Sequence, residues 1–139
     1  MDQSFVLSSA SRGTAGILLL SIVAIESGGW YMLKIVRGQA PVTDFQATFA
    51  RAGHAHAGVL VSLGLICQIL VDAADVSGLW ETIAREGVPV AAILIPAGFF
   101  FSSMGRGVTK PNALITLIYA GVLSLAAGVI ALGVGLLTA

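Results

Sequence analysis

Charged residues are scarce in this sequence. They make up 10% of the 139 residues, whereas hydrophobic residues make up 57%, and the mean hydropathy is +0.96. Soluble domains carry about 25% charged residues, so the composition predicts an integral membrane protein with nothing left over for a second, soluble domain. The seven basic and seven acidic residues balance, so the charge gives no argument for binding nucleic acid.

Cysteine and histidine are scarce as well. The single cysteine, Cys67, lies inside an apolar run, which excludes an internal disulfide and any cysteine-rich metal motif. The two histidines, His54 and His56, are close together. No nucleophile–base pair or phosphate-binding loop supports a hydrolase or a nucleotide-dependent enzyme. The first residues lack the basic start and cleavage site of a signal peptide, so we expect the whole chain to be mature.

Four apolar runs are each close to the ~20 residues that cross a bilayer. They span Thr14–Val36, Phe45–Val71, Val88–Met104 and Ala113–Thr138. The connection at residues 72–87 is polar enough to form a short interfacial helix of its own. Since antiparallel helices with short connections form bundles, we predict an all-α, integral membrane four-helix bundle, a single domain over residues 1–139.

Basic residues favour one side of this predicted bundle. One side carries four basic residues, Lys34, Arg37, Arg106 and Lys110, and the other carries two, Arg12 and Arg85. Because cytoplasmic loops carry an excess of lysine and arginine, the first side is predicted to be cytoplasmic. Both termini are then extracytoplasmic, in a plasma or inner membrane.

Each predicted helix carries one unusual residue at a similar depth. At about 1.5 Å per residue, Glu26 lies about 12 Å inward from one helix end, His54 and Pro96 about 15 Å, and Tyr119 about 10 Å. Glu26 is the only acid within any span, and such groups are functional candidates because they are costly in a membrane. Pro96 cannot continue the helical hydrogen bonding, so we expect a free carbonyl at Ala92.

The two histidines point about 200° apart on an ideal helix. His54 shares a polar stripe with Arg51, Gln68 and Asp72, which we expect to face the bundle interior. His56 lies on another face, so the pair is not expected to chelate one metal ion as an HxxxH pair does. The two imidazoles instead suit two places, the bundle core and a subunit interface.

These residues form the candidate site. We expect Glu26, Arg51, His54 and Tyr119 to make a buried polar cluster, with His56 nearby. Three interpretations stay open. The cluster is a structural hydrogen-bond network; or it holds haem or a transition metal ion such as copper, with His54, His56 and Glu26 as ligands; or Glu26 and His54 form a proton relay in a small transporter or channel.

The stretch Gly53-His54-Ala55-His56 resembles the start of a histidine-bearing helix in relatives of haem–copper oxidase subunit I. The resemblance covers four residues, and Val61 stands where such relatives often have a glycine. In that family, twelve helices form three arcs of four, so this chain would resemble one arc. The resemblance implies an axial-ligand role for His54 or His56. With both histidines on one helix, an oxidase-like centre would form only between chains.

The last apolar run carries a stripe of small residues, which lets helices approach closely in lipid. The stripe is Gly121, Ser124, Gly128, Ala131 and Gly135. It suits packing within the chain and an oligomer interface equally well. We expect a lipid-embedded homo-oligomer, a dimer or trimer, that binds haem or metal for electron transfer beside a respiratory partner. The alternatives are a proton-coupled transporter or channel and a structural accessory subunit of a membrane complex.

Overall fold

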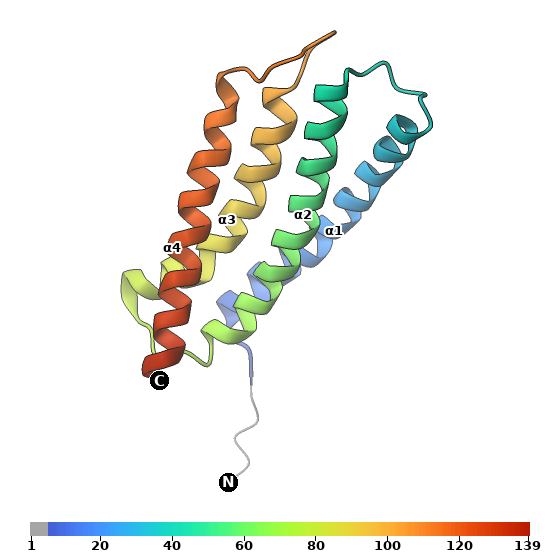
Figure 1. Cartoon of the computed structure of the whole chain (residues 1–139). Coiled ribbons are helices and arrows are strands. Elements are labelled where there is room, and N and C mark those ends of the chain that lie inside the picture. The colour runs from blue at the N-terminus through green and yellow to red at the C-terminus, as the bar shows by residue number, and fades with distance from the viewer. Residues whose placement is uncertain (1–5) are drawn as a thin grey trace.

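The structure is a computed structural model that describes residues 6–139 and is built from four long helices (Figure 1). They are α1 (Ser9–Val36), α2 (Asp44–Val71), α3 (Gly78–Ser102) and α4 (Thr116–Thr138), the last preceded by a 3-10 turn, η1 (Ala113–Ile115). All four are long and apolar enough to cross a membrane. The prediction of an all-α, multi-pass four-helix bundle is therefore confirmed. The expectation about the start of the chain falls partly on residues 1–5, outside the described range.

Helix α3 begins at Gly78 rather than at Val88, so the predicted interfacial helix is wrong. The polar stretch instead forms the first turns of α3, and the connection from α2 is only residues 72–77. Glu81 and Arg85 are four residues apart on one helix face and form an ion pair of 2.8 Å. Such i,i+4 pairs stabilise a helix, and pairing lets this charged turn pack against neighbouring helices.

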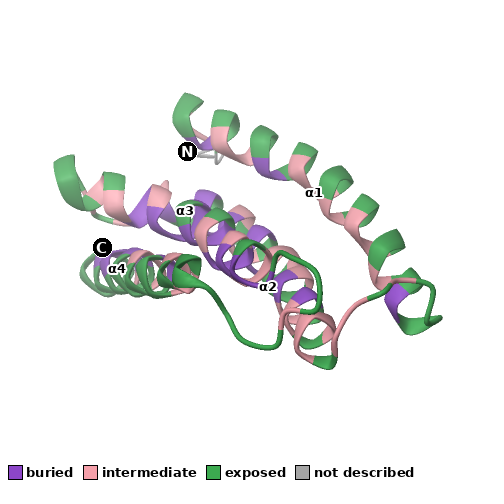
Figure 2. Ribbon diagram, turned by 90° about the horizontal axis from the view of Figure 1, so that it is seen from above, coloured by how far each residue is buried: buried purple, intermediate pink, exposed green. Residues whose placement is uncertain are grey.

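The four helices pack mainly in sequence order and leave the bundle open. Helix α1 packs on α2, α2 on α3 and α3 on α4, whereas α1 and α4 are not in contact (Figures 1 and 2). Most of α1 is exposed, and the buried residues gather between α2, α3 and α4 (Figure 2). The start of α1 and the end of α4 lie at the same end of the molecule (Figure 1). A row of helices of this kind has two broad outer sides.

The closest helix contact joins α3 to α4 through glycine. A Cβ atom built on Gly128 would lie 2.9 Å from the Cα of Gly87, and one on Gly121 would lie 2.5 Å from Ile95. The hydroxyl of Ser124 donates to the carbonyl of Gly87 at 2.8 Å. The stripe therefore packs within the chain, with Gly121, Ser124 and Gly128 against α3 and Gly135 against residues 74–76, which agrees with the first of the two alternatives. Close backbone approach is the feature that small residues contribute in lipid.

Replacing Gly128 by leucine should lower the free energy of unfolding of the single chain. A leucine there has to push α3 and α4 apart, and overpacking of this kind costs about 1–3 kcal/mol. Gly133 is the matched control, because a Cβ on it meets nothing within 4 Å. Thermal unfolding in detergent should show a lower midpoint for Gly128→Leu than for Gly133→Leu. Equal midpoints would contradict this packing.

Candidate functional site

A buried polar network lies at the end of the molecule where the chain begins. The guanidinium of Arg85 on α3 is 3.2 Å from the Asp72 carboxylate and 2.8 Å from Glu81. It also donates to the hydroxyl of Ser11 on α1. The side chains of Arg85 and Asp72 are each 8% exposed. The network therefore joins three helices around one ion pair that is shielded from solvent.

Asp72, directly after α2, is held in its ionised form. The backbone N–H of Ser8 donates to its carboxylate at 2.7 Å, and the Ser11 hydroxyl donates at 2.9 Å. Burial by itself would raise the pKa of Asp72, but the hydrogen bonds from Ser8, Ser11 and Arg85 outweigh burial and hold this pKa below its ordinary value. Asp72 thus fixes the start of α1 against the end of α2.

Gln68 extends the network to the turn of α3 that precedes Pro89. A proline removes the hydrogen bond to the carbonyl four residues earlier, which for Pro89 is that of Arg85. The side-chain amide of Gln68 donates to this carbonyl at 2.9 Å. For Pro96, the other proline within α3, no side chain among residues 6–139 donates to the carbonyl of Ala92. The sequence predicts a free carbonyl at Ala92, whereas the carbonyl that receives a side-chain donor is that of Arg85.

The network was missed because its charges were assigned to a connection. The prediction started the third helix at Val88, which placed Asp72, Glu81 and Arg85 in a polar loop. Two signals were present in the sequence. Glu81 and Arg85 have i,i+4 spacing, and Gln68 and Asp72 continue the polar stripe of the preceding helix. That stripe does face inward here, since Gln68 is fully buried. Its contacts are those of a structural clamp.

Asp72→Asn should destabilise the protein by about 3 kcal/mol. This is the lower end for breaking a buried ion pair, because Glu81 still pairs with Arg85. The folded pKa of Asp72 lies below the unfolded value of about 3.9, so its stabilisation is present above that pH and is lost as the pH falls through the folded pKa. Thermal unfolding between pH 7 and pH 3 measures both effects.

The exposed Asp75 provides the control for this clamp. Asp75→Asn should leave both the unfolding midpoint and its acid dependence close to those of the unchanged protein. The acid-induced loss of stability should be smaller in Asp72→Asn, which has no carboxylate to protonate at this position. An Asp72→Asn protein as stable as Asp75→Asn at neutral pH would show that the ion pair contributes nothing.

The two histidines of α2 have different surroundings. His54 is half-buried against α1, where a Cβ on Gly28 would lie 3.5 Å from its Nδ1 and one on Gly29 would lie 3.9 Å from its Nε2. These are ordinary van der Waals distances, so the ring lies directly against this part of α1. His56 is exposed, and its Nδ1 lies 2.7 Å from the carbonyl oxygen of Ala52. The prediction that the imidazoles serve two places agrees with this arrangement.

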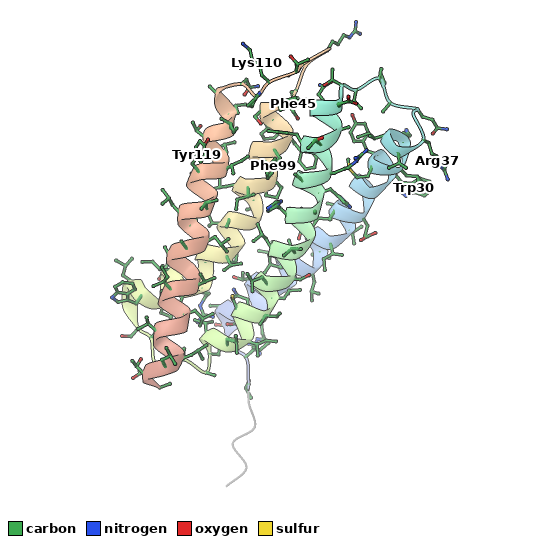
Figure 3. All side chains as sticks on the ribbon, viewed as in Figure 1. Trp30, Arg37, Phe45, Phe99, Lys110 and Tyr119 are labelled. Atoms are coloured by element: carbon green, nitrogen blue, oxygen red, sulfur yellow. The ribbon has the colours of Figure 1, made fainter. Side chains whose placement is uncertain are left out.

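His56 continues a row of aromatic rings along α2 and α3. Its ring centroid is 5.1 Å from that of Phe99, which is 5.3 Å from Phe49, which in turn is 4.2 Å from Phe45. Phe45 and Phe99 lie where α2 and α3 adjoin (Figure 3). His56 is twelve residues into a helix of 28, so it lies about 18 Å along it, near mid-membrane. An imidazole is therefore presented at this depth beside flat apolar rings.

The remaining predicted site residues do not join the histidines in a buried cluster. Glu26, Arg51 and Tyr119 are all exposed, and Tyr119 lies on α4, at the opposite edge of the row from α1 (Figure 3). The expected cluster within one chain is thus wrong, because an open row of helices has no closed interior to collect them. No hydrogen bond joins Glu26 to His54 in residues 6–139, so the proton relay stays a prediction.

Residues 6–139 contain no group of three or more histidine, cysteine, aspartate or glutamate side chains placed to hold a metal ion.

Comparison with known proteins gave no relative. No family model, curated protein or solved structure matches the chain. Function is therefore inferred from the residues and their geometry.

Proposed function

We propose that the protein is a small membrane protein of electron transfer that binds haem through His56. The single observation that carries the proposal is the 2.7 Å contact between Nδ1 of His56 and the carbonyl oxygen of Ala52. A carbonyl oxygen only accepts hydrogen bonds, so Nδ1 carries the proton. The lone pair of the neutral ring is then on Nε2, the nitrogen that remains for a ligand.

This arrangement is the one that metal-ligating histidines use. Their second ring nitrogen almost always donates to a carboxylate, a backbone carbonyl or water, which fixes the tautomer and the orientation of the ring. The tilted contact between the rings of His56 and Phe99 restrains the imidazole further. His56 is therefore pre-oriented, and a lone pair left unpaired at mid-membrane is costly unless something binds it.

The donor set favours haem over a bare metal ion. Haem brings its own macrocycle and asks the protein for one or two axial ligands, whereas copper or another ion needs several protein ligands around it. His56 offers one ligand beside the rings of Phe49 and Phe99, which suit a flat apolar partner. Bound haem would supply one-electron chemistry, while His56 would hold and orient it and the lipid-facing aromatic rings would exclude water.

The setting of this proposal is a cell membrane with the basic end in the cytoplasm. Arg37 and Lys110 lie at the same end of the molecule (Figure 3), which supports a cytoplasmic position for both connections. The termini are then extracytoplasmic. The open row of four helices accords with the resemblance to one arc of the haem–copper oxidase relatives, and a respiratory electron donor or acceptor is the partner class this implies.

His56→Ala should remove haem from the purified protein, whereas His54→Ala should retain it. The ring of His54 is packed against Gly28 and Gly29 of the same chain, so it serves here as the matched control. The measurement is the Soret absorbance per chain, with iron and copper content determined on the same samples after growth with a haem precursor. Helical content measured alongside shows whether each variant is folded.

Three outcomes would contradict the proposal. The unchanged protein lacks haem, or His56→Ala keeps it in full, or haem is lost only from His54→Ala. Copper without haem in the unchanged protein would indicate that the cofactor is instead a copper ion bound by residues of more than one chain.

A further inference from the structure

Helices α1 and α2 carry two unpaired charges on one side of the row. Glu26 and Arg51 are both exposed, and both ion pairs found in residues 6–139 belong to Arg85. Neither charge donates or accepts a side-chain hydrogen bond within that range. We call the side of the α1–α2 pair that bears Glu26 and Arg51 the charged face.

A groove on the opposite side shows that the two charges share a face. The groove runs between α1 and α3 and is lined by Ser21 of α1 and Ala57 of α2, among others. Around its helix, Glu26 is turned by about 80° to 180° from the α1 residues that line the groove, and Arg51 by about 80° to 120° from Ala57 and Val61 of α2. A separate hollow contains Glu26 with Gly29, on the far side of α1.

The two charges also lie at a similar depth. Glu26 is ten residues before the end of α1 at Val36, and Arg51 is seven residues after the start of α2 at Asp44. These separations correspond to about 15 Å and about 10 Å from the same end of the helix pair. A difference of about 5 Å is within the reach of the two long side chains.

Charges at this depth need partners. Ionisable residues within membrane spans almost always face a bundle interior or a wet cavity, and they pair with one another or with backbone carbonyls. Glu26 and Arg51 have opposite charges and are present once each in every chain. A second copy turned by 180° about the membrane normal presents Arg51 where the first presents Glu26, and the reverse. The surface is therefore complementary to itself.

We propose that the charged face is the interface of a twofold-symmetric dimer, in which Glu26 of each copy pairs with Arg51 of the other. The interface lies on α1 and α2, not on the glycine stripe of α4. It closes with two equivalent ion pairs, which leaves no charge on this face in contact with lipid. Each helix α1, little covered by its own chain, gains a protein neighbour.

The inference stands apart from the proposed function, since neither Glu26 nor Arg51 is a ligand of haem there. His56 is one residue from Ala57 and is turned by about 100° from the groove. Its ring adjoins Phe99 of α3 and points about 140° away from Arg51 around α2. A protein without haem would refute the role of His56 and leave the dimer to be judged on its own test.

Charge reversal measures the pairing. Glu26→Arg places two arginines opposite each other at both contacts, and Arg51→Glu places two glutamates there. Each single variant should lower the association constant of the dimer in lipid vesicles at least about tenfold, because interhelical polar contacts in bilayers have about this effect. Reversal of Lys110, which is exposed in the connection between α3 and α4, is the control and should leave dimerisation unchanged.

Co-expression of the two single variants distinguishes pairing between chains from pairing within one. A Glu26→Arg chain beside an Arg51→Glu chain restores an arginine–glutamate pair at both contacts. Differently tagged copies should therefore form a mixed dimer that co-purifies, although neither variant dimerises with itself. Pairing within a chain would leave both variants defective together, as would an Arg51 that binds only lipid phosphate.

The outcomes are decisive in each direction. A mixed dimer from two self-incompatible variants supports the proposal. A monomeric unchanged protein in vesicles, single variants that dimerise as well as the unchanged chain, or a failure of the mixed pair to associate would each overturn it. Circular dichroism of every variant confirms that it is helical before its association is compared.

Discussion

The requirement that every polar group in hydrocarbon finds a partner shapes this structure. Water is not available there to satisfy an exposed N–H, carbonyl or charge. Arg85 shows the requirement met within one chain, by Asp72, Glu81 and the hydroxyl of Ser11. Gln68 meets it again for the carbonyl that Pro89 leaves free. Glu26, Arg51 and His56 have no such solution within residues 6–139, and the functional proposals follow from that contrast.

The two halves of the bundle are held together by different means. Helices α3 and α4 approach through Gly87 and Gly128 until a single added Cβ would collide. Helix α1 is joined to its neighbours by the clamp around Asp72 at its beginning and by Leu18, Ile22 and Ile25, which pack into the apolar core, and is otherwise largely exposed. A tightly packed pair beside a lightly covered helix leaves α1 and α2 as the surface on which further contacts in the membrane can form.

The fold could be predicted from the sequence because length and hydropathy alone determine how many helices cross the bilayer. The start of α3 could not, since a hydropathy pattern treats Arg85 as a loop charge until its partners are known. Two of these partners, Ser8 and Ser11, are more than seventy residues away in sequence. The same reasoning explains the small-residue stripe, whose pattern suits a contact within the chain or between chains until the position of Gly87 is fixed.

The candidate site was predictable in its residues but not in its arrangement. The helical periodicity placed His54 and His56 on different faces, and the structure agrees. Depth alone suggested that Glu26 and Tyr119 would meet, because an equal level in the membrane was read as a shared interior. In an open row, residues at one level do not share a common interior. The packing order of the helices places Tyr119, on α4, away from Glu26, Arg51 and His54, on α1 and α2.

The most direct test of this account is a distance between two copies in a lipid bilayer. Spin labels can be attached at position 58 or at position 133 of a chain with Cys67 replaced, since a Cβ at either glycine meets nothing within 4 Å. Gly58 is seven residues from Arg51 on the same side of α2, whereas Gly133 is on α4. Double electron–electron resonance in vesicles should give a shorter label-to-label distance, with a narrow distribution, at position 58 than at position 133. A shorter distance at position 133, or no defined distance at either position, would contradict a dimer formed through Glu26 and Arg51.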